Sequence, residues 1–151
     1  MIAHPLSNEP PVARLPVSDQ QRTEDITVRI IRLYADDSGE SHFDDLEEHG
    51  VEHRVHADFT RVIDAYGLSF KETGELGDEP TLGEWHCAPQ RQYVLFLTGR
   101  TEIEASDGEK RIISAGDVLL VEDVHGKGHR NRRLDPAPEL WAFVRSHFPR
   151  A

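Results

Sequence analysis

The sequence contains very little cysteine and no long hydrophobic run. Cys87 is the only cysteine among 151 residues, so disulfide bonds within one chain are excluded, and a cytoplasmic location is expected. No stretch approaches the roughly eighteen consecutive apolar residues of a transmembrane helix, so no membrane partner is predicted. The N-terminus lacks a basic start followed by an apolar stretch, which argues against a secretory signal.

Basic residues are outnumbered by acidic ones. The chain has 17 lysines and arginines against 28 aspartates and glutamates, a formal net charge of −11. Such a field repels the phosphates of nucleic acids and anionic lipid surfaces, so neither is expected as a partner. The basic residues that cluster over 127–133 are interpreted as one face of a solvated strand rather than as an anion-binding rim.

Several catalytic signatures are missing as well. The sequence contains no GxSxG elbow, no phosphate-binding glycine loop, no HExxH helix and no paired CxxC motif. These absences argue against a serine hydrolase, a nucleotide-binding protein and a zinc finger.

The chain is expected to hold one domain after an N-terminal arm. Residues 1–24 include four prolines, which lack a backbone donor and fix φ, so no regular element is predicted there. This segment is interpreted as an arm that is either mobile or draped over a neighbouring subunit. Residues 25–151 show no internal repeat, and the length suits one hydrophobic core.

Strand patterns dominate the first part of this domain. Apolar and polar residues alternate over 26–34, and turn-forming residues follow over 36–39. Segment 42–49 is acidic and is compatible with either a helical turn or a loop. Segments 51–56 and 59–70 are predicted strands, with a short helix over 61–66 as the alternative. Residues 71–80 have the composition of a loop.

The second part carries clearer signals of the same kind. Strands are predicted over 92–98, 101–106, 110–113, 118–121 and 139–144. Asp107-Gly108 is a strong hairpin signal, and 115–117 forms another tight turn. Short strands separated by turns at regular intervals are typical of an all-β sandwich or barrel.

Residues 85–132 resemble the two sequence motifs of the cupin superfamily. The first motif has two histidines one residue apart, then a glutamate, then a glycine seven residues later. With Gly99 at the glycine, Gln92 takes the place of the glutamate, His86 is the first histidine, and Ala88 replaces the second. The second motif begins at 115–117, continues as an apolar strand and ends at His129, after a loop about two residues longer than usual.

The resemblance implies a cupin jelly-roll barrel, also called a double-stranded β-helix, with a small-molecule pocket. It extends to stand-alone bacterial cupins without an assigned reaction. Cupins commonly pair through sheet edges, so a homodimer is expected, and an arm that crosses to the partner would protect those edges. Because the superfamily hosts many unrelated activities, the resemblance does not identify the substrate.

In metal-dependent cupins, three histidines and the glutamate hold a divalent metal such as Fe, Mn, Ni, Cu or Zn. This sequence keeps His86 and His129 and offers the neutral amide of Gln92. The resemblance therefore implies a reduced ligand set of these three residues, in which the metal polarises a substrate oxygen.

Two alternatives stay open at this point. The first is a metal-free isomerase, cyclase or lyase in which His86 or His129 moves a proton and Gln92 or Arg91 orients the substrate. The second is a non-catalytic protein that uses the same cavity to sense or store a metabolite.

The remaining candidate site residues follow from strand alternation and from the motif. Gln92 and Phe96 share one strand face, which is expected to line the cavity, whereas Arg91 belongs to the opposite face. Arg91 is either a clamp for a substrate carboxylate or phosphate, or a partner in a surface ion pair. Trp141 either floors the pocket or fills the core. His125 either turns in from the extended loop or is exposed to solvent.

Two acidic residues precede that loop. Glu122 and Asp123 either form an acid–base pair at the barrel mouth or are solvated loop residues.

Overall fold

The computed structural model describes residues 26–75 and 82–150, and its regular structure in these ranges is entirely β. The predicted arm, residues 1–24, lies outside the described residues. Ten strands are present in the described ranges: β1 (Thr27–Ala35), β2 (Ser41–Arg54), β3 (Ala57–Thr60), β4 (Tyr66–Thr73), β5 (Gln92–Phe96), β6 (Arg100–Ala105), β7 (Lys110–Ser114), β8 (Val118–Glu122), β9 (His129–Arg133) and β10 (Glu139–Arg145).

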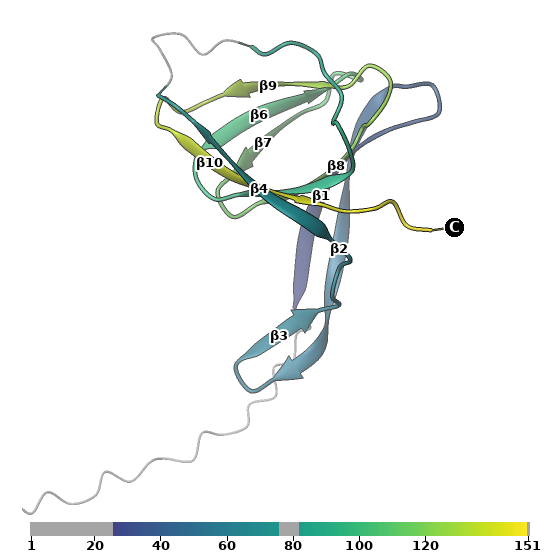
Figure 1. Ribbon diagram of the computed structural model, residues 1–151, viewed down its shortest axis with the longest axis vertical. Coiled ribbons are helices and arrows are strands. Elements are labelled where there is room, and N and C mark those ends of the chain that lie inside the picture. Colours follow the sequence, from purple (N-terminus) through teal and green to yellow (C-terminus); the bar gives the residue numbers. More distant parts are fainter. Residues whose placement is uncertain (1–25, 76–81, 151) are drawn as a thin grey trace, which may run out of the picture.

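The strands form two facing sheets (Figure 1). The larger sheet has the order β3-β2-β1-β8-β5-β10-β4, and the smaller has the order β7-β6-β9. β1 and β8 pair in parallel, and the other neighbours are antiparallel. This two-sheet jelly roll confirms the all-β fold that the cupin resemblance predicts.

The first hairpin shows how local sequence sets the fold. Gly39 has a φ of +84°, a left-handed conformation that glycine adopts without strain. One carboxylate oxygen of Asp36 accepts hydrogen bonds from the backbone N–H groups of Ser38 and Glu40, at 2.9 and 3.1 Å. This turn joins β1 to β2.

Three local predictions need correction. Segment 42–49 is part of β2, because each of its residues pairs with β1 along a continuous register. The alternative helix over 61–66 does not form, and β4 begins at Tyr66. β4 also continues to Thr73, into the segment predicted as a loop, because it pairs with β10 up to that residue.

β9 contains the arginines of the basic cluster that is interpreted as a solvated strand, although its sequence HRNRR lacks the apolar residues of the other strands. It forms because it pairs with β6, whose acidic side chains meet its arginines. Arg130 donates to Glu104 at 2.8 Å, and Arg132 donates to Glu102 at 3.0 Å.

The main hydrophobic core lies between the two sheets. Its most completely buried large side chains are Leu33, Phe96 and Ile113, from three different strands. A second, smaller cluster of Ile30, Tyr93 and Leu120 lies on the other face of the large sheet. Gln92–Phe96 therefore contributes to both clusters, with alternate residues on opposite faces, as the period of a strand requires.

The β2–β3 hairpin projects away from the two-sheet body (Figure 1). β1 pairs with β2 only as far as His49, so the rest of β2 is held by β3 alone. Val55 and Val62, at and just after this hairpin, are 91% and 95% exposed. No helix in the described part of the chain is long and apolar enough to cross a membrane.

Candidate functional site

A cavity of about 380 Å³ lies between the sheets. Its lining comes from β4, β5, β8 and β10 of the large sheet, from β6 and β9 of the small sheet, and from segment 86–90. Of the residues expected to form the site, five line this cavity: His86, Gln92, Phe96, His129 and Trp141. The fold therefore brings together residues from segments that are far apart in the sequence.

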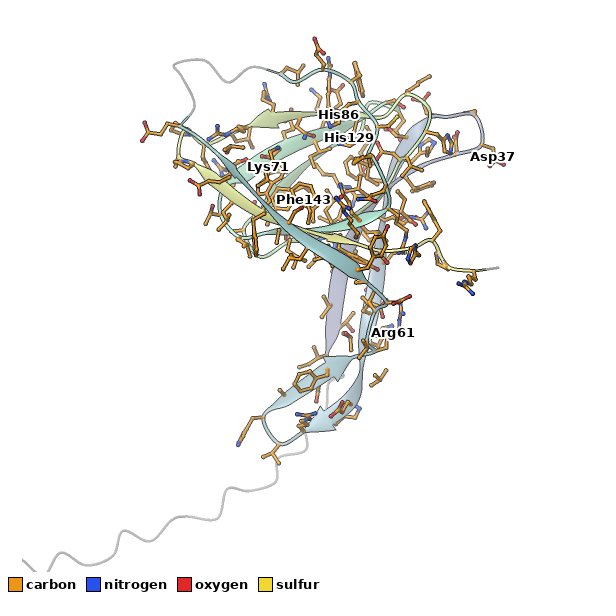
Figure 2. The ribbon with its side chains drawn as sticks, in the orientation of Figure 1. Asp37, Arg61, Lys71, His86, His129 and Phe143 are labelled. Carbon is orange, nitrogen blue, oxygen red and sulfur yellow. The ribbon has the colours of Figure 1, made fainter. Side chains whose placement is uncertain are left out.

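His86 and His129 form an antiparallel bridge. The backbone N–H of each residue donates to the carbonyl oxygen of the other, both at 2.9 Å. Residues that face each other in such a pair project their side chains from the same face. The two imidazole rings accordingly lie 4.4 Å apart between centroids, tilted by 57°, and Figure 2 shows them side by side.

Each imidazole has one nitrogen engaged in a hydrogen bond. Nδ1 of His129 lies 2.6 Å from a carboxylate oxygen of Asp123, and Nδ1 of His86 lies 3.0 Å from the carbonyl oxygen of Glu84. Both partners accept hydrogen bonds, so Nδ1 carries the proton in each neutral ring. Nε2 of each ring is then left with a free lone pair.

Asp123 is a candidate site residue whose environment the sequence did not predict. Neither proposed role fits, because its side chain is completely buried against His129. Glu122 instead forms an ion pair with Arg91 at 2.8 Å. Asp123 lies six residues before His129, and the extended loop separates the two in the sequence. Composition alone therefore could not distinguish this buried carboxylate from an exposed loop aspartate.

Gln92 and the aromatic residues form the opposite wall of the cavity. The sheet register places Gln92 opposite Arg145, and Trp141 between Phe96 and Lys71. The Gln92 side chain is buried, yet it makes no hydrogen bond to another described residue. Trp141 both lines the cavity and packs against Phe96, with ring centroids 4.4 Å apart, so it fills the core and walls the pocket.

Arg91 does not share this cavity. As the strand alternation predicts, it lies on the other face of the large sheet, beside a separate hollow of about 570 Å³. Its guanidinium donates to Glu122, to the Ser146 hydroxyl and to the His147 carbonyl oxygen, at 2.8, 2.7 and 2.9 Å. All of these contacts are internal, and they tie residues 146–147 to the sheet.

His125 is likewise apart from the two motif histidines. It is exposed and borders a shallow hollow beside Arg32 and Tyr34. Cys87 is not among the residues that line the cavity, and its thiol donates to the Gly126 carbonyl oxygen at 3.3 Å.

Five further polar residues line the cavity, although they are not motif positions: Ser69, Lys71, Gln90, Asn131 and Arg145. Asn131 follows His129 by two positions on β9 and so shares its face. Its side-chain oxygen is buried without a hydrogen-bond partner among the described residues. No pattern in the sequence marks these positions, because their role depends on which strands become neighbours.

The donor atoms of the site differ from those of a complete cupin metal centre. In the ranges 26–75 and 82–150, no group of three or more histidine, cysteine, aspartate and glutamate side chains lies close enough to hold a metal ion. His86 and His129 supply two imidazoles, Gln92 supplies a neutral amide, and Ala88 has no donor atom. Two of the four ligand positions therefore carry good metal ligands, the imidazoles. The other two carry a weak ligand, the Gln92 amide, and no ligand at all, at Ala88.

Comparisons with known proteins find matches among solved structures alone. No family model and no curated protein matches the sequence. Two of the solved structures that resemble it illustrate the likeness. Protein NMB1881 from Neisseria meningitidis has a TM-score of 0.36 and 18% identity, covering 56% of this chain and 79% of that one. A candidate ethanolamine utilization protein Q from Salmonella typhimurium has a TM-score of 0.34 and 12% identity, covering 80% and 97%. The activity is therefore inferred from the residues of this chain.

Proposed function

We propose that this protein binds a small organic molecule between its sheets and transfers a proton within it without a metal ion. The single observation that carries this proposal is the short contact between buried Asp123 and His129, whose other nitrogen is free beside His86. The reaction classes that fit are isomerisation, cyclisation and elimination, in which one histidine alternates between base and acid.

In this scheme Nε2 of His129 accepts a proton from the bound molecule. The imidazolium that forms is stabilised by the carboxylate of Asp123, which also keeps Nδ1 protonated and the ring in one orientation. The proton then returns to a different atom of the same molecule, from His129 or through the neighbouring imidazole of His86. In an elimination that atom belongs to the leaving group, whose bond to carbon breaks as the double bond forms. No proton is gained or lost overall, so neither an oxidant nor a second substrate is needed.

The opposite wall supplies binding and orientation. Phe96, Trp141 and Phe143 present apolar surface that displaces water from the bound molecule. The amide of Gln92 and the orphaned oxygen of Asn131 offer hydrogen bonds to its polar groups. A buried polar atom without a partner is costly, and a ligand group that meets it offsets this cost.

Deuterium exchange tests this proposal with compounds of many kinds, so the substrate need not be identified first. A library of small metabolites is incubated with the protein in D2O, and mass spectrometry records the incorporation of deuterium at carbon. We expect at least one compound to be labelled by the wild type and not by His129→Gln, with Arg150→Gln as the control. Binding without labelling of any compound would overturn proton transfer and favour a non-catalytic binding protein.

A metal-dependent enzyme is the second candidate function. Hydrogen bonding of both Nδ1 atoms is typical of metal-binding histidines, since it fixes the rings and leaves Nε2 available. A divalent metal held by His86, Gln92 and His129 would polarise a substrate oxygen. Elemental analysis of untagged protein beside His129→Ala distinguishes the candidates. Near-stoichiometric metal in the wild type alone would favour the metal, and none after incubation with Fe, Mn, Ni, Cu and Zn would remove it.

We also propose that two copies of this chain associate. The projecting hairpin exposes Val55, Phe59 and Val62. A mainly apolar hollow of about 310 Å³ lies on the outer face of the large sheet, between Val28 and Val118. Exposed apolar surface of this kind is stabilised when a second surface covers it. A homodimer in which these regions meet is the arrangement that the fold favours.

A further inference from the structure

We infer that the ligand of the cavity is a compact organic anion, a carboxylate carried on an apolar body. This inference rests on the proposed function, because it concerns the same cavity. It comes from the distribution of charge around the site, which differs from that of the rest of the molecule.

The charged side chains that line the cavity are Lys71 and Arg145, and among the described residues no carboxylate lines it. The whole chain, in contrast, has a net charge of −11. A positively charged wall in an acidic protein is not explained by composition. It locally favours a ligand of negative charge and disfavours a cation.

Lys71 and Arg145 are also unusual in lacking an ionic partner. Among the described residues, every lysine and arginine except Lys71, Arg145 and Arg150 lies within 4.0 Å of a carboxylate oxygen. Two of the three unpaired cations of the described chain therefore border the same cavity. A carboxylate on the ligand would supply the counter-charge that the protein itself does not provide.

Glu139 is an acidic residue that influences Lys71 from outside the cavity. It attracts Lys71 electrostatically, but its carboxylate is buried and accepts hydrogen bonds from the Thr101 hydroxyl at 3.0 and 3.1 Å. It is not part of the cavity lining. Lys71 thus stays available to a ligand, and its ammonium lies 4.5 Å from the centre of the Trp141 ring.

The positions of these groups divide the cavity into parts. β10 presents Trp141, Phe143 and Arg145 at alternate positions, so apolar surface lies between the two cations, and Lys71 is opposite Trp141 on β4. His86 and His129 lie on the other side of the cavity, where His129 begins β9 of the small sheet and His86 is bridged to it (Figure 2). A ligand whose carboxylate meets the cationic wall and whose apolar body covers Trp141 would present its remaining atoms to the histidines.

Trp141 provides a direct optical signal for a test. The chain has two tryptophans, and the other, Trp85, is exposed. Trp85→Phe therefore leaves Trp141 as the sole tryptophan, at the cavity wall. The probes are 3-phenylpropionate and its neutral amide, which have the same shape and differ in charge. Their affinities are measured by titrating the fluorescence of Trp141 at about millimolar concentrations and below.

We expect the carboxylate to bind about tenfold more tightly than the amide, and this preference to shrink as salt is added. In Lys71→Met/Arg145→Met the two probes should bind equally. Arg150→Met, which removes the third unpaired cation but lies outside the cavity, should keep the preference. A second pair of probes, benzoate and benzamide, should show the same preference for the carboxylate and the same loss in the double variant. This result would show that the preference depends on the charge of the probe and not on the rest of its structure.

Equal binding of acid and amide to the unaltered cavity would overturn the anion inference and leave the proposed function standing. Persistence of the preference in the double variant would also overturn it, since another group would then recognise the charge. No response to either carboxylate would likewise overturn it. The deuterium-exchange experiment uses compounds of every charge and decides the proposed function separately.

Discussion

Gly128 lies so close to His86 that a Cβ atom at position 128 would overlap the His86 carbonyl oxygen. The φ of Gly128 is +73°, a conformation that other residues rarely adopt. Both properties serve the pairing of His86 with His129, because the chain must turn sharply just before β9 and pass close to segment 86–90. A glycine in the extended loop thus helps to position both histidines.

We expect Gly128→Ala to lower the free energy of unfolding by about 2 kcal/mol or more, through backbone strain and overlap together. Urea denaturation measures this loss. Gly108→Ala is the matched control, because Gly108 has a φ of +95° and a Cβ there would contact nothing within 4 Å. The control should lose stability through strain alone. Equal losses in the two variants would show that the close approach to His86 is unimportant.

Asp123→Asn should change the tautomer of His129. The asparagine amide can donate to Nδ1, which would move the ring proton to Nε2 and leave no base facing the cavity. Two-dimensional ¹H–¹⁵N NMR of the imidazole nitrogens reports this directly. Any proton transfer found by deuterium exchange should fall by about 10²-fold to 10⁴-fold.

The control for this change is Glu122→Gln, which alters the adjacent carboxylate that pairs with Arg91. It should leave the nitrogen signals of His129 as they are. An unchanged Nε2 signal in Asp123→Asn would contradict the role assigned to Asp123.

Glu139 should make stability depend on pH. Burial is the largest cause that raises the pKa of its carboxyl above the ordinary value of 4.5. The folded protein therefore holds this proton more tightly than the unfolded chain. The resulting stabilisation is fully present below the unfolded pKa and is lost as pH rises through the folded pKa.

Thermal melts of the wild type and Glu139→Gln from about pH 4 to pH 7 test this expectation. The stability of the wild type relative to the variant should fall across the range, because glutamine does not titrate. A difference that stays constant or grows with pH would show that the carboxylate is stabilised rather than destabilised by its surroundings.

The proposed homodimer predicts a change in molecular mass with one pair of substitutions. Light scattering after size exclusion should give twice the chain mass for the wild type and the chain mass for Val55→Asp/Val62→Asp, because burial of the two carboxylates would be unfavourable. Ile112→Asp is the control, since Ile112 is exposed on the small sheet, away from the hairpin. A monomeric wild type would remove the proposal.

Much of the fold could be predicted because its local signals are strong. The alternation over β5, the turn glycines and the apolar run of β8 each indicate one structure. β2 and β9 were harder, because both are rich in charge and polar groups. Their stability comes from pairing with neighbours, such as Arg130 on β9 with Glu104 on β6, which depends on strand order rather than on local composition.

The same limit applies to the candidate site. The resemblance to the cupin motifs implied that His86, Gln92 and His129 lie together, and all three line the same cavity. The folded structure was needed to place three other residues at the site: Asp123, Lys71 and Arg145. Lys71 reaches the cavity because β4 pairs with β10, and no periodic pattern in the sequence joins those two segments.

The position of β10 has a consequence for how the protein assembles during synthesis. β10 lies between β5 and β4 in the large sheet, so β4 pairs with no other strand among the described residues. Residues 66–73 must therefore leave the ribosome and wait unpaired until residues 139–145 follow. Until then β4 has no strand to pair with, and the part of the cavity lining that β4 contributes does not exist. A nascent chain that stalls before residue 139 would leave the backbone of residues 66–73 unpaired and accessible to chaperones.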